Sequence, residues 1–277
     1  MTVYTGRGSE EPITQASAVL ISLETAVMAF VESITHVFGV ETGSVSHRVG
    51  QVHVIHHPND ILHHYPREFS FRREFVSLGG ATEDVLESVR LTLSSPTEDH
   101  VLYVFGDDVG ANIPQYEAMG YQHAWNNGLM AVQIDATRSP LAPDYFLIRE
   151  LTEIADVAMY EGLGGPTAVG HTLFDPHIHS FVSYDQSGKP LGRSQLVTKV
   201  DRFAYVSGMF TAPDHRNRGV GSGLMNTMHK RARREGAEYC ILVPSRMASE
   251  INFYPRFGYE VVAPHSVFVP VGPDLPV

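Results

Sequence analysis

Three glycines and two arginines stand close together in the segment HRNRGVGSG, residues 215–223. An apolar run that ends at Thr211 precedes them, and a helical pattern follows. The first turn of a helix has backbone N–H groups without partners inside the helix, and the helix dipole makes that end positive. An anion can bind there when no Cβ atom holds it away, and glycine also permits unusual backbone angles. The segment predicts a phosphate or pyrophosphate site at the amides of residues 218–223, with Arg216 and Arg218 as charged donors. A glycine-rich turn that only caps a helix is the alternative.

The residues around this segment are typical of alternating strands and helices. Antiparallel strands are predicted over 179–211, where the turn DQSGKP has the glycine and proline of a hairpin. Leu224, Met228 and Ala232 recur at helical spacing after the glycines. Gly236 is placed to end that helix. The other predicted elements are a strand over 145–151, a helix over 152–162, a strand over 239–244, a short helix ending at Gly258 and a strand over 266–271.

The first half of the chain contains a weaker copy of this pattern at an offset of 138 residues. The stretch QYEAMGYQ, residues 115–122, matches FYPRFGYE, residues 253–260, and both place a tyrosine four residues before a Gly-Tyr pair. The same offset aligns VLYVFG with YCILVP, and the amphipathic stretch EDVLESVRLTL with the helix after the glycines. Three elements in register predict a duplication followed by fusion.

The two copies are unequal in their candidate chemistry. We expect a degenerate half over 1–136 and an active half over 143–277, joined by the proline-containing segment 135–144. In the degenerate half the first arginine and the first two glycines of the anion segment are replaced by Leu78, Ala81 and Glu83.

The segment TAPDHRNRGVGSGLM resembles the central signature of the GNAT superfamily of acetyltransferases, R/Q-x-x-G-x-G/A. Arg216, Gly219 and Gly221 fit this signature. The stretch NFYPRFGYE resembles the family's later motif, a tyrosine followed by a Gly-aromatic pair. The resemblance covers residues 143–270 well, and the first half resembles only the later part of such a domain. It implies an α/β fold of the α+β kind, a mixed and mostly antiparallel sheet flanked by helices. The sheet would splay open after the strand that ends at Thr211, and the fold would be duplicated in tandem.

The resemblance also implies that acetyl-CoA binds in the splay as a co-substrate. Its pyrophosphate would contact the glycine loop, and its pantetheine would pair with the preceding strand. The implied cofactor-binding residues are Met209, Phe210, Thr211, Arg216, Arg218, Gly219, Val220, Gly221, Ser222 and Gly223. Many members of the family carry an asparagine seven residues before the tyrosine, and here that residue is Met247. Asn252 is the candidate in its place, with Ser249 as the alternative.

Tyr254 is the implied catalytic residue. In the family a tyrosine at this position often donates the proton that the leaving thiolate needs, and a phenol with an ordinary pKa of about 10 suits that role. A purely structural tyrosine is the alternative. The amine must also lose a proton to a base or a water chain. The candidates for the base, none of them favoured, are Glu250, His177, His179 and Asp201.

The expected activity is the transfer of an acetyl group to a primary amine of a small molecule. A non-catalytic acyl-CoA-binding or regulatory protein and an acyl-CoA decarboxylase are the alternatives. The net charge of −11 disfavours a nucleic-acid partner and favours a cationic acceptor. The chain is expected to be a monomer or a homodimer.

Composition excludes several other kinds of site. The single cysteine, Cys240, rules out an internal disulfide and a cysteine-based zinc site. Five histidines lie within 53–64, but no H-E-x-x-H spacing occurs among them, so no metal is predicted. The apolar run 16–31 is interrupted by Glu24 and is too short to span a bilayer. We expect it to form a helix on the core of a cytoplasmic protein without a membrane partner.

Overall fold

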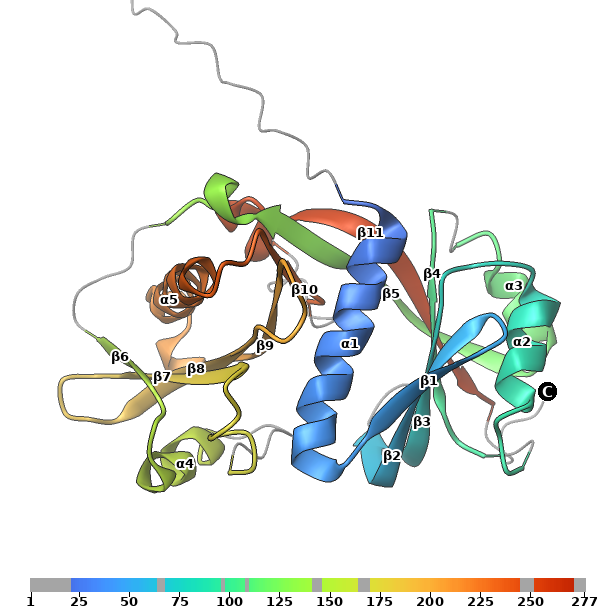
Figure 1. Ribbon diagram of the computed structural model, residues 1–277, viewed down its shortest axis with the longest axis horizontal. Coiled ribbons are helices and arrows are strands. Elements are labelled where there is room, and N and C mark those ends of the chain that lie inside the picture. Colours follow the sequence, from blue (N-terminus) through green and yellow to red (C-terminus); the bar gives the residue numbers. More distant parts are fainter. Residues whose placement is uncertain are drawn as a thin grey trace, which may run out of the picture.

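The computed structural model describes residues 21–63, 68–95, 98–107, 110–140, 146–163, 170–244 and 252–271. These residues form one eleven-stranded sheet with helices on both faces (Figure 1). The strands, in sheet order, are β1 (Val45–Val49), β2 (Val52–His63), β3 (Phe69–Ser77), β4 (Val101–Phe105), β11 (Glu260–Pro270), β5 (Tyr121–Gln133), β10 (Tyr239–Leu242), β9 (Phe203–Thr211), β8 (Pro190–Val197), β7 (Ile178–Tyr184) and β6 (Leu147–Glu150). The helices are α1 (Leu23–Thr42), α2 (Thr82–Arg90), α3 (Ile113–Ala118), α4 (Ile154–Glu161) and α5 (Val220–Arg234), with the 3-10 turns η1 (Ile134–Ala136), η2 (Pro213–His215) and η3 (Tyr254–Phe257). The predicted α/β fold with a mixed, mostly antiparallel sheet is confirmed, because only β3–β4 and β9–β10 pair in parallel among the described strands.

The two faces of the sheet carry different helices. On β5, Leu129 and Ala131 pack into the cluster that includes α1, while Met130 and Val132 pack into the cluster that includes α5. Successive side chains of a strand point to opposite faces, so α1 and α5 cover opposite faces of the sheet. In Figure 1, α1 crosses the centre of the molecule, with α5 on one side and α2 and α3 on the other.

Helix α1 begins and ends later than its apolar run predicts. Ser22 caps its N-terminus by accepting a hydrogen bond from the Thr25 N–H, and Gly43 ends it in the left-handed conformation. The helix therefore extends to Thr42, and residues 16–20 of the predicted helix lie outside the described residues. By length and composition α1 could cross a membrane, but here it packs on the sheet. Its buried residues are Ala26, Val27, Ala29, Phe30, Val31, Ser33, Ile34 and Val37.

The pairing of β5 with β11 relates the two halves of the chain by a pseudo-twofold axis. Asn127 pairs with His265, and these two residue numbers differ by 138. The pairs on either side of this central pair follow the same offset. Trp125 pairs with Val267 and Leu129 with Ala263, and adding 138 to the first residue of each pair gives the second residue of the other pair. The pairs Asn126–Ser266 and Gly128–Pro264 are related in the same way. Residues that are 138 positions apart in the sequence therefore occupy equivalent places in the two halves.

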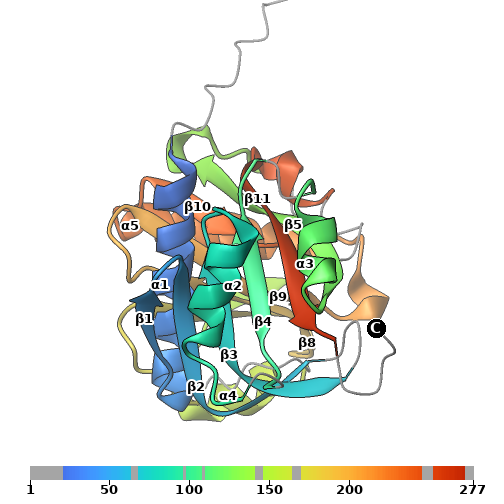
Figure 2. The same cartoon turned by 90° about the vertical axis from the view of Figure 1, so that its right-hand side faces the viewer.

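The halves also exchange their last strands. Strand β5 of the first half pairs with β10 of the second, and β11 of the second half pairs with β4 of the first. Figure 2 shows β11 lying between β4 and β5. Strand β11 begins at Glu260, six residues earlier than predicted, because it pairs along the length of β5. The boundary between 1–136 and 143–277 stays a prediction, since the exchanged strands join both halves in one sheet.

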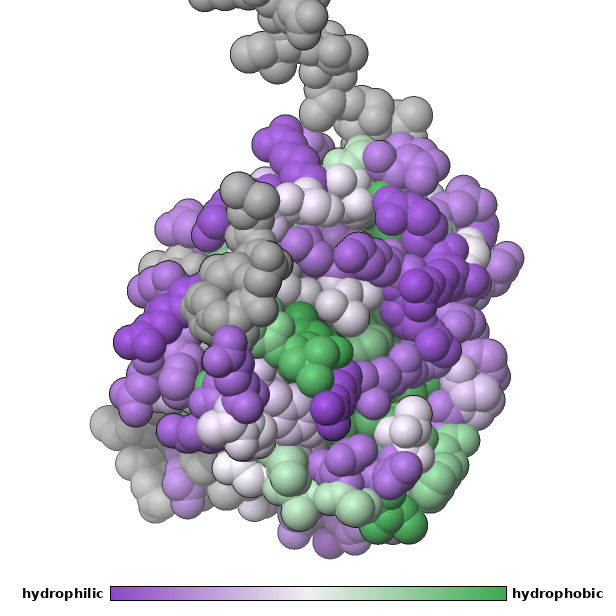
Figure 3. All heavy atoms as spheres, turned by 90° about the vertical axis from the view of Figure 1, so that its left-hand side faces the viewer, coloured by the Kyte–Doolittle hydropathy of each residue, from purple (hydrophilic) through white to green (hydrophobic). Residues whose placement is uncertain are grey.

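One side of the molecule is formed by α5, β6 and α4. Hydrophilic side chains cover most of this side, and hydrophobic ones gather in small areas of it (Figure 3). In the second half, the large hydrophobic residues that are exposed are Leu147, Ile154, Met159, Phe174 and Val261. Scattered residues of this kind are normal on a protein surface and do not indicate an interface.

His265 is buried at the pseudo-twofold axis. Its side chain is 1% exposed, and neither ring nitrogen has a well-aligned hydrogen-bond partner in the described part of the chain. Its ring lies 4.5 Å from the ring of Phe105, centroid to centroid. Burial lowers the pKa of His265 to about 4, and the Ala263 backbone offsets this only in part. The histidine is therefore neutral in the folded protein at neutral pH.

Replacing His265 with leucine is expected to weaken the acid sensitivity of the fold. The unfolded histidine binds a proton below about pH 6.5, whereas the folded one does so only near pH 4, so stability is lost as the pH falls between these values. The group's share of this loss is roughly 3 kcal/mol by pH 4. Urea unfolding of wild type and His265→Leu at pH 7, 5.5 and 4.5 measures the difference. His47→Leu, at an exposed position on β1, is the control, and equal pH dependence in all three proteins would contradict the expectation.

Candidate functional site

The sheet opens between β9 and β10. These strands pair in parallel only at residues 203–205 of β9 with 239–241 of β10. Beyond Tyr205, β9 continues to Thr211 beside β8, and no described strand pairs with its other edge. The backbone groups of residues 206–211 on that edge are available to a ligand. The sheet thus opens after the strand that ends at Thr211, as predicted, and the two strands part beyond Tyr205.

A bulge interrupts β9 inside this opening. Gly208 and Met209 together oppose Ser194 of β8, so one residue lies outside the regular ladder. Gly208 has a φ of 58°, which side-chain-bearing residues rarely adopt. A Cβ atom there would also lie 3.0 Å from the hydroxyl oxygen of Tyr160. The position requires glycine, and the bulge interrupts the pairing with β8 at Gly208 and Met209, while Phe210 and Thr211 stay in register with β8.

The glycine loop leads from β9 into α5 through two left-handed residues. Asn217 has a φ of 58°, and Gly219, the N-cap residue of α5, has a φ of 85°. Gly219 provides no side-chain cap, so the first amides of α5 are left to another partner. The Arg216 Nε donates to the Thr211 carbonyl oxygen over 3.2 Å and holds the loop against the end of β9. Successive N–H groups in such a turn form a concave anion site.

The glycines inside α5 have two different roles. A Cβ on Gly221 would lie 3.2 Å from Phe253 Cζ and 3.7 Å from Thr211 Oγ1, so Gly221 lies where β9, α5 and the segment before η3 meet. A Cβ on Gly223 would lie 2.5 Å from Phe146 Cε2, on the side of β6. The Gly223 N–H donates to the Gly219 carbonyl oxygen over 2.9 Å. Gly223 therefore packs the helix on the sheet, and the amides left for an anion are those before it.

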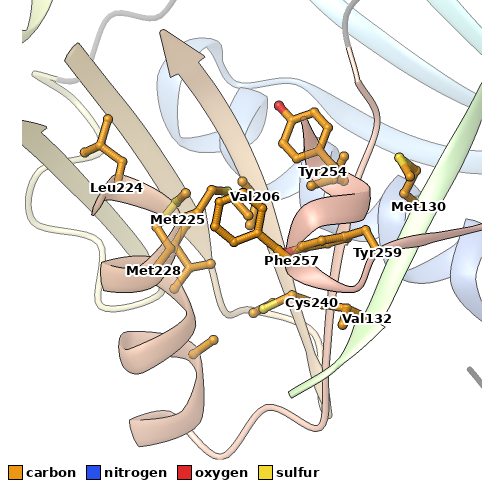
Figure 4. Close-up of a cluster of buried hydrophobic side chains, with 14 of the residues drawn as sticks. Met130, Val132, Val206, Leu224, Met225, Met228, Cys240, Tyr254, Phe257 and Tyr259 are labelled. Atoms are coloured by element: carbon orange, nitrogen blue, oxygen red, sulfur yellow. The ribbon is translucent and has the colours of Figure 1, made fainter. Parts of the chain in front are cut away.

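Tyr254 lies at the start of η3 and is 5% exposed. Its ring centroid is 5.3 Å from that of Phe253 and 6.1 Å from that of Tyr259. Figure 4 shows its hydroxyl directed away from the rings of Phe257 and Tyr259. Tyr259, in contrast, is bound within the core, where its hydroxyl is 3.0 Å from His229 Nε2. Of these two tyrosines, Tyr254 is the one whose neighbour in the sequence, Phe253, lies against Gly221.

The remaining predicted residues fall in different surroundings. Val220 and Ser222 are buried at the start of α5, and Asn252 is exposed before η3. Arg218 makes contacts at the loop. Met247, Ser249 and Glu250 lie outside the described residues.

None of the three described candidates for the base contacts the residues around Gly221. The His179 Nδ1 is 2.9 Å from Glu150 Oε1, and Arg231 donates to Glu150 Oε2 over 3.1 Å. Burial lowers the pKa of His179. His177 stacks edge-on with the ring of another histidine, His36, at 6.0 Å. Asp201 is exposed in a turn. The contacts of these three residues therefore do not support any of them as the base.

The corresponding helix of the first half, α2, has an N-terminus of opposite chemistry. Ala81 is its N-cap and is extended, with a φ of −64°, where the second half has a left-handed glycine. Glu83 and Asp84 occupy the first turn and place carboxylates where an anion would bind. The described part of the chain contains no group of three His, Cys, Asp or Glu residues that could hold a metal ion.

Three residues near the bulge were not singled out from the sequence, namely Tyr160, Arg193 and Gln195. All three are buried, and Arg193 is only 3% exposed. One feature of the sequence could have indicated them, namely an arginine within the stretch PLGRSQLV, which is otherwise typical of a buried strand.

Residues 176–261 match a protein family described as acetyltransferase (GNAT) domain. The second half of this chain contains a GNAT acetyltransferase domain. The match includes β7, β8, β9, the glycine loop, α5, β10 and η3, and so it contains both strands that border the opening.

Solved structures show that the GNAT likeness extends over most of the fold. A GCN5-related N-acetyltransferase from Kribbella flavida superposes with a TM-score of 0.67 at 16% identity, covering 90% of this chain and 96% of its own. One from Sphaerobacter thermophilus has a TM-score of 0.57 at 16% identity, covering 82% and 83%. A tandem GNAT protein from the clavulanic acid biosynthesis pathway has a TM-score of 0.55 at 13% identity, covering 82% and 80%. Among curated protein sequences there is no match. The tandem GNAT-like fold that was predicted is thus confirmed.

Gly221→Leu in the GNAT domain is expected to weaken acetyl-CoA binding by about tenfold or more, since it fills the space between Thr211 and Phe253 beside the free amides. Isothermal titration calorimetry with acetyl-CoA measures the change. Glu83→Leu, at the corresponding exposed position of α2, is the matched control and should leave the affinity unchanged. Undiminished binding by Gly221→Leu would remove the anion site from this loop.

Gly223→Ala is expected to destabilise the GNAT domain by about 1–3 kcal/mol, because its Cβ would overlap Phe146 and Ile148. Gly221→Ala gains the same helix propensity but meets only a ring atom at 3.2 Å, so it is the matched comparison. Thermal and urea unfolding measure both variants. If Gly223→Ala proved as stable as Gly221→Ala, the packing role of Gly223 would be wrong.

Proposed function

We propose that the protein is an acetyl-CoA-dependent N-acetyltransferase that acts on a primary amine of a small molecule. One observation carries the proposal. The Thr211 side chain at the end of β9, the first turn of α5 and the ring of Phe253, which precedes Tyr254, meet at Gly221. A Cβ there would lie 3.7 Å from Thr211 Oγ1 and 3.2 Å from Phe253 Cζ. An anion site, an unpaired strand edge and a proton donor therefore adjoin one another, as transfer from a nucleotide-tailed thioester requires.

The described residues fit acetyl-CoA as the co-substrate. The amides that precede Gly223, together with Arg216 and Arg218, would hold the pyrophosphate. The free edge of β9 at Met209, Phe210 and Thr211 would pair with the amide groups of the pantetheine. Acetyl-CoA supplies the acetyl group in activated form as a thioester.

Two features of the chain would assist the transfer. A backbone N–H freed by the bulge near Met209 donates to the carbonyl oxygen as negative charge develops on it, and a fixed donor of this kind is effective in a site shielded from water. The Tyr254 hydroxyl gives its proton to the departing sulfur. The amine loses its own proton to a base or to water, and the described candidates leave that group unassigned.

The first half of the chain would contribute structure rather than a second active centre. Its helix α2 begins with two carboxylates and lacks the left-handed glycine, which disfavours a second pyrophosphate site. It pairs with the second half as a partner subunit would, and α1 contacts β9 and β10 beside the opening. A single chain would then suffice for activity.

Tyr254→Phe is expected to lower kcat by about 100-fold or more while the affinity for acetyl-CoA is retained, because only the proton donor is removed. Thiol release in steady state and calorimetric binding measure the two quantities. Tyr116→Phe is the control, since Tyr116 is the residue that corresponds to Tyr254 in the first half. Full activity of Tyr254→Phe would exclude it as the acid.

A panel of small primary amines, assayed by thiol release with acetyl-CoA, tests the activity itself. Release that depends on an amine supports the proposal. Tight binding of acetyl-CoA without turnover on any amine would favour a binding or regulatory protein instead. Consumption of malonyl-CoA without an acceptor would favour a decarboxylase.

A further inference from the structure

Arg193 carries a buried positive charge without an anionic partner in the described part of the chain. Its side chain is 3% exposed, and its Nε and Nη1 atoms make no hydrogen bond. The guanidinium lies between two aromatic rings, with its Cζ 4.7 Å from the ring centroid of Tyr160 and 6.0 Å from that of Phe210. Cation–π contacts offset only part of the cost of removing an arginine from water. A buried guanidinium in this state requires an anion to complete it.

This charge does not belong to the pyrophosphate site. Its neighbour Gly192 faces α5, because a Cβ there would lie 2.9 Å from Val220 Cγ1. Side chains alternate along a strand, so Arg193 points to the opposite face, where α4 provides Tyr160. Arg216 and Arg218 remain on the α5 side. The two positive sites therefore lie on opposite faces of the strand that ends at the glycine loop.

Arg193 lies beside the bulge near which the acetyl group would be held. Its Nη1 is 3.9 Å from the position that a Cβ on Gly208 would take, and Tyr160 Oη is 3.0 Å from the same point. Gln195 donates through Nε2 to Thr172 Oγ1 over 3.5 Å, which leaves its Oε1 without a partner. The Tyr160 hydroxyl has no well-aligned hydrogen bond among the described residues, although it interacts with the Arg193 guanidinium. A donor-rich and incompletely paired group of atoms thus borders the bulge on the α4 face.

The first half of the chain adds one carboxylate to this neighbourhood. Glu41, at the end of α1, has an unpaired and buried Oε1. Burial raises the pKa of the Tyr160 hydroxyl, the charge of Arg193 lowers it, and the charge of Glu41 adds a smaller rise.

We propose that Arg193 binds an anionic group of the acceptor, so that the amine acetylated by this enzyme belongs to a zwitterion such as an α-amino acid. This inference rests on the proposed function and narrows its substrate class. It adds an anionic group to the cationic acceptor that the net charge favoured, because the net charge of the whole chain says little about the charge at one buried position.

The test compares acceptors that differ only in the anion. Wild type and Arg193→Met are assayed with α-amino acids, their methyl esters and their decarboxylated amines, and with ethanolamine phosphate against ethanolamine. Wild type should prefer the anionic member of each set in kcat/KM by about 30-fold or more, and Arg193→Met should lose that preference. The carboxylate and phosphate sets identify which anion is bound. Arg149→Met, an exposed arginine 6.0 Å from the Tyr184 ring, is the control and should keep the preference.

Binding measurements keep the inference testable if Arg193→Met folds poorly or turnover is low. Calorimetry of wild type and Arg193→Lys saturated with coenzyme A should show binding of N-acetylated amino acids that exceeds binding of the corresponding N-acetylated amines, and a weaker difference in the lysine variant. Wild type that acetylates uncharged and anionic acceptors equally well would overturn this inference and leave the proposed function standing. Failure to acetylate any amine would instead overturn the proposed function, and equal binding of both product types would then overturn this inference as well.

Discussion

The structure depends on the antiparallel pairing of β5 with β11 at the centre of the sheet. Each of these strands ends one half of the chain, and each pairs on its outer edge with the other half. The pairing buries Leu129 and Ala263 on one face, where α1 packs, and so fixes the helix that bridges both halves. The opening between β9 and β10 follows from this arrangement. Strand β10 is held by β5, while β9 continues along β8, and the two part after three paired residues.

The two halves share one fold but differ in their helix N-termini, and this difference leaves a single candidate active centre among the described residues. Both halves have two parallel strands connected by a helix, yet of these two helices only α5 begins with a left-handed glycine and has no acidic residue in its first turn. The first half has a different set of polar side chains on its strands β2 and β3. There Glu74 accepts from buried His57, whose Nδ1 contacts Ser44 beside the end of α1, so these three polar side chains have partners. The second half leaves several such groups incomplete, as a ligand site requires.

The sequence indicated the local features of the site because they are local. Glycine at residue 219 indicated a sharp turn directly, and its observed backbone angle agrees. The anion site indicated by Gly221 and Arg216 stays a prediction. The offset of 138 also proved to be a three-dimensional relation, since it reproduces the register of the central strands. The exchange of strands could not be read in this way. An apolar stretch such as 101–105 pairs equally well with either of two related strands, and only the packing of both halves decides between them.

Other features were hidden for related reasons. The limits of α1 depend on Ser22 and Gly43 more than on the apolar run before them. The environment of Arg193 depends on a helix, a strand and an end of α1 that are far apart in sequence. Alternation along β8 shows that the arginine is buried, but whether a carboxylate meets it is decided by the tertiary structure alone.

The exchanged strands have a consequence for how such a chain could have arisen and how it tolerates cutting. Each half completes the sheet of the other, as two identical subunits do when they swap a terminal segment, so an ancestral homodimer could have been fused without a change in its contacts. A nick in the connection after Ala136 would sever the covalent link and leave the interlocked strands in place. The two fragments would then behave as complementary pieces that reassemble on mixing, whereas either alone would present uncovered strand edges and aggregate.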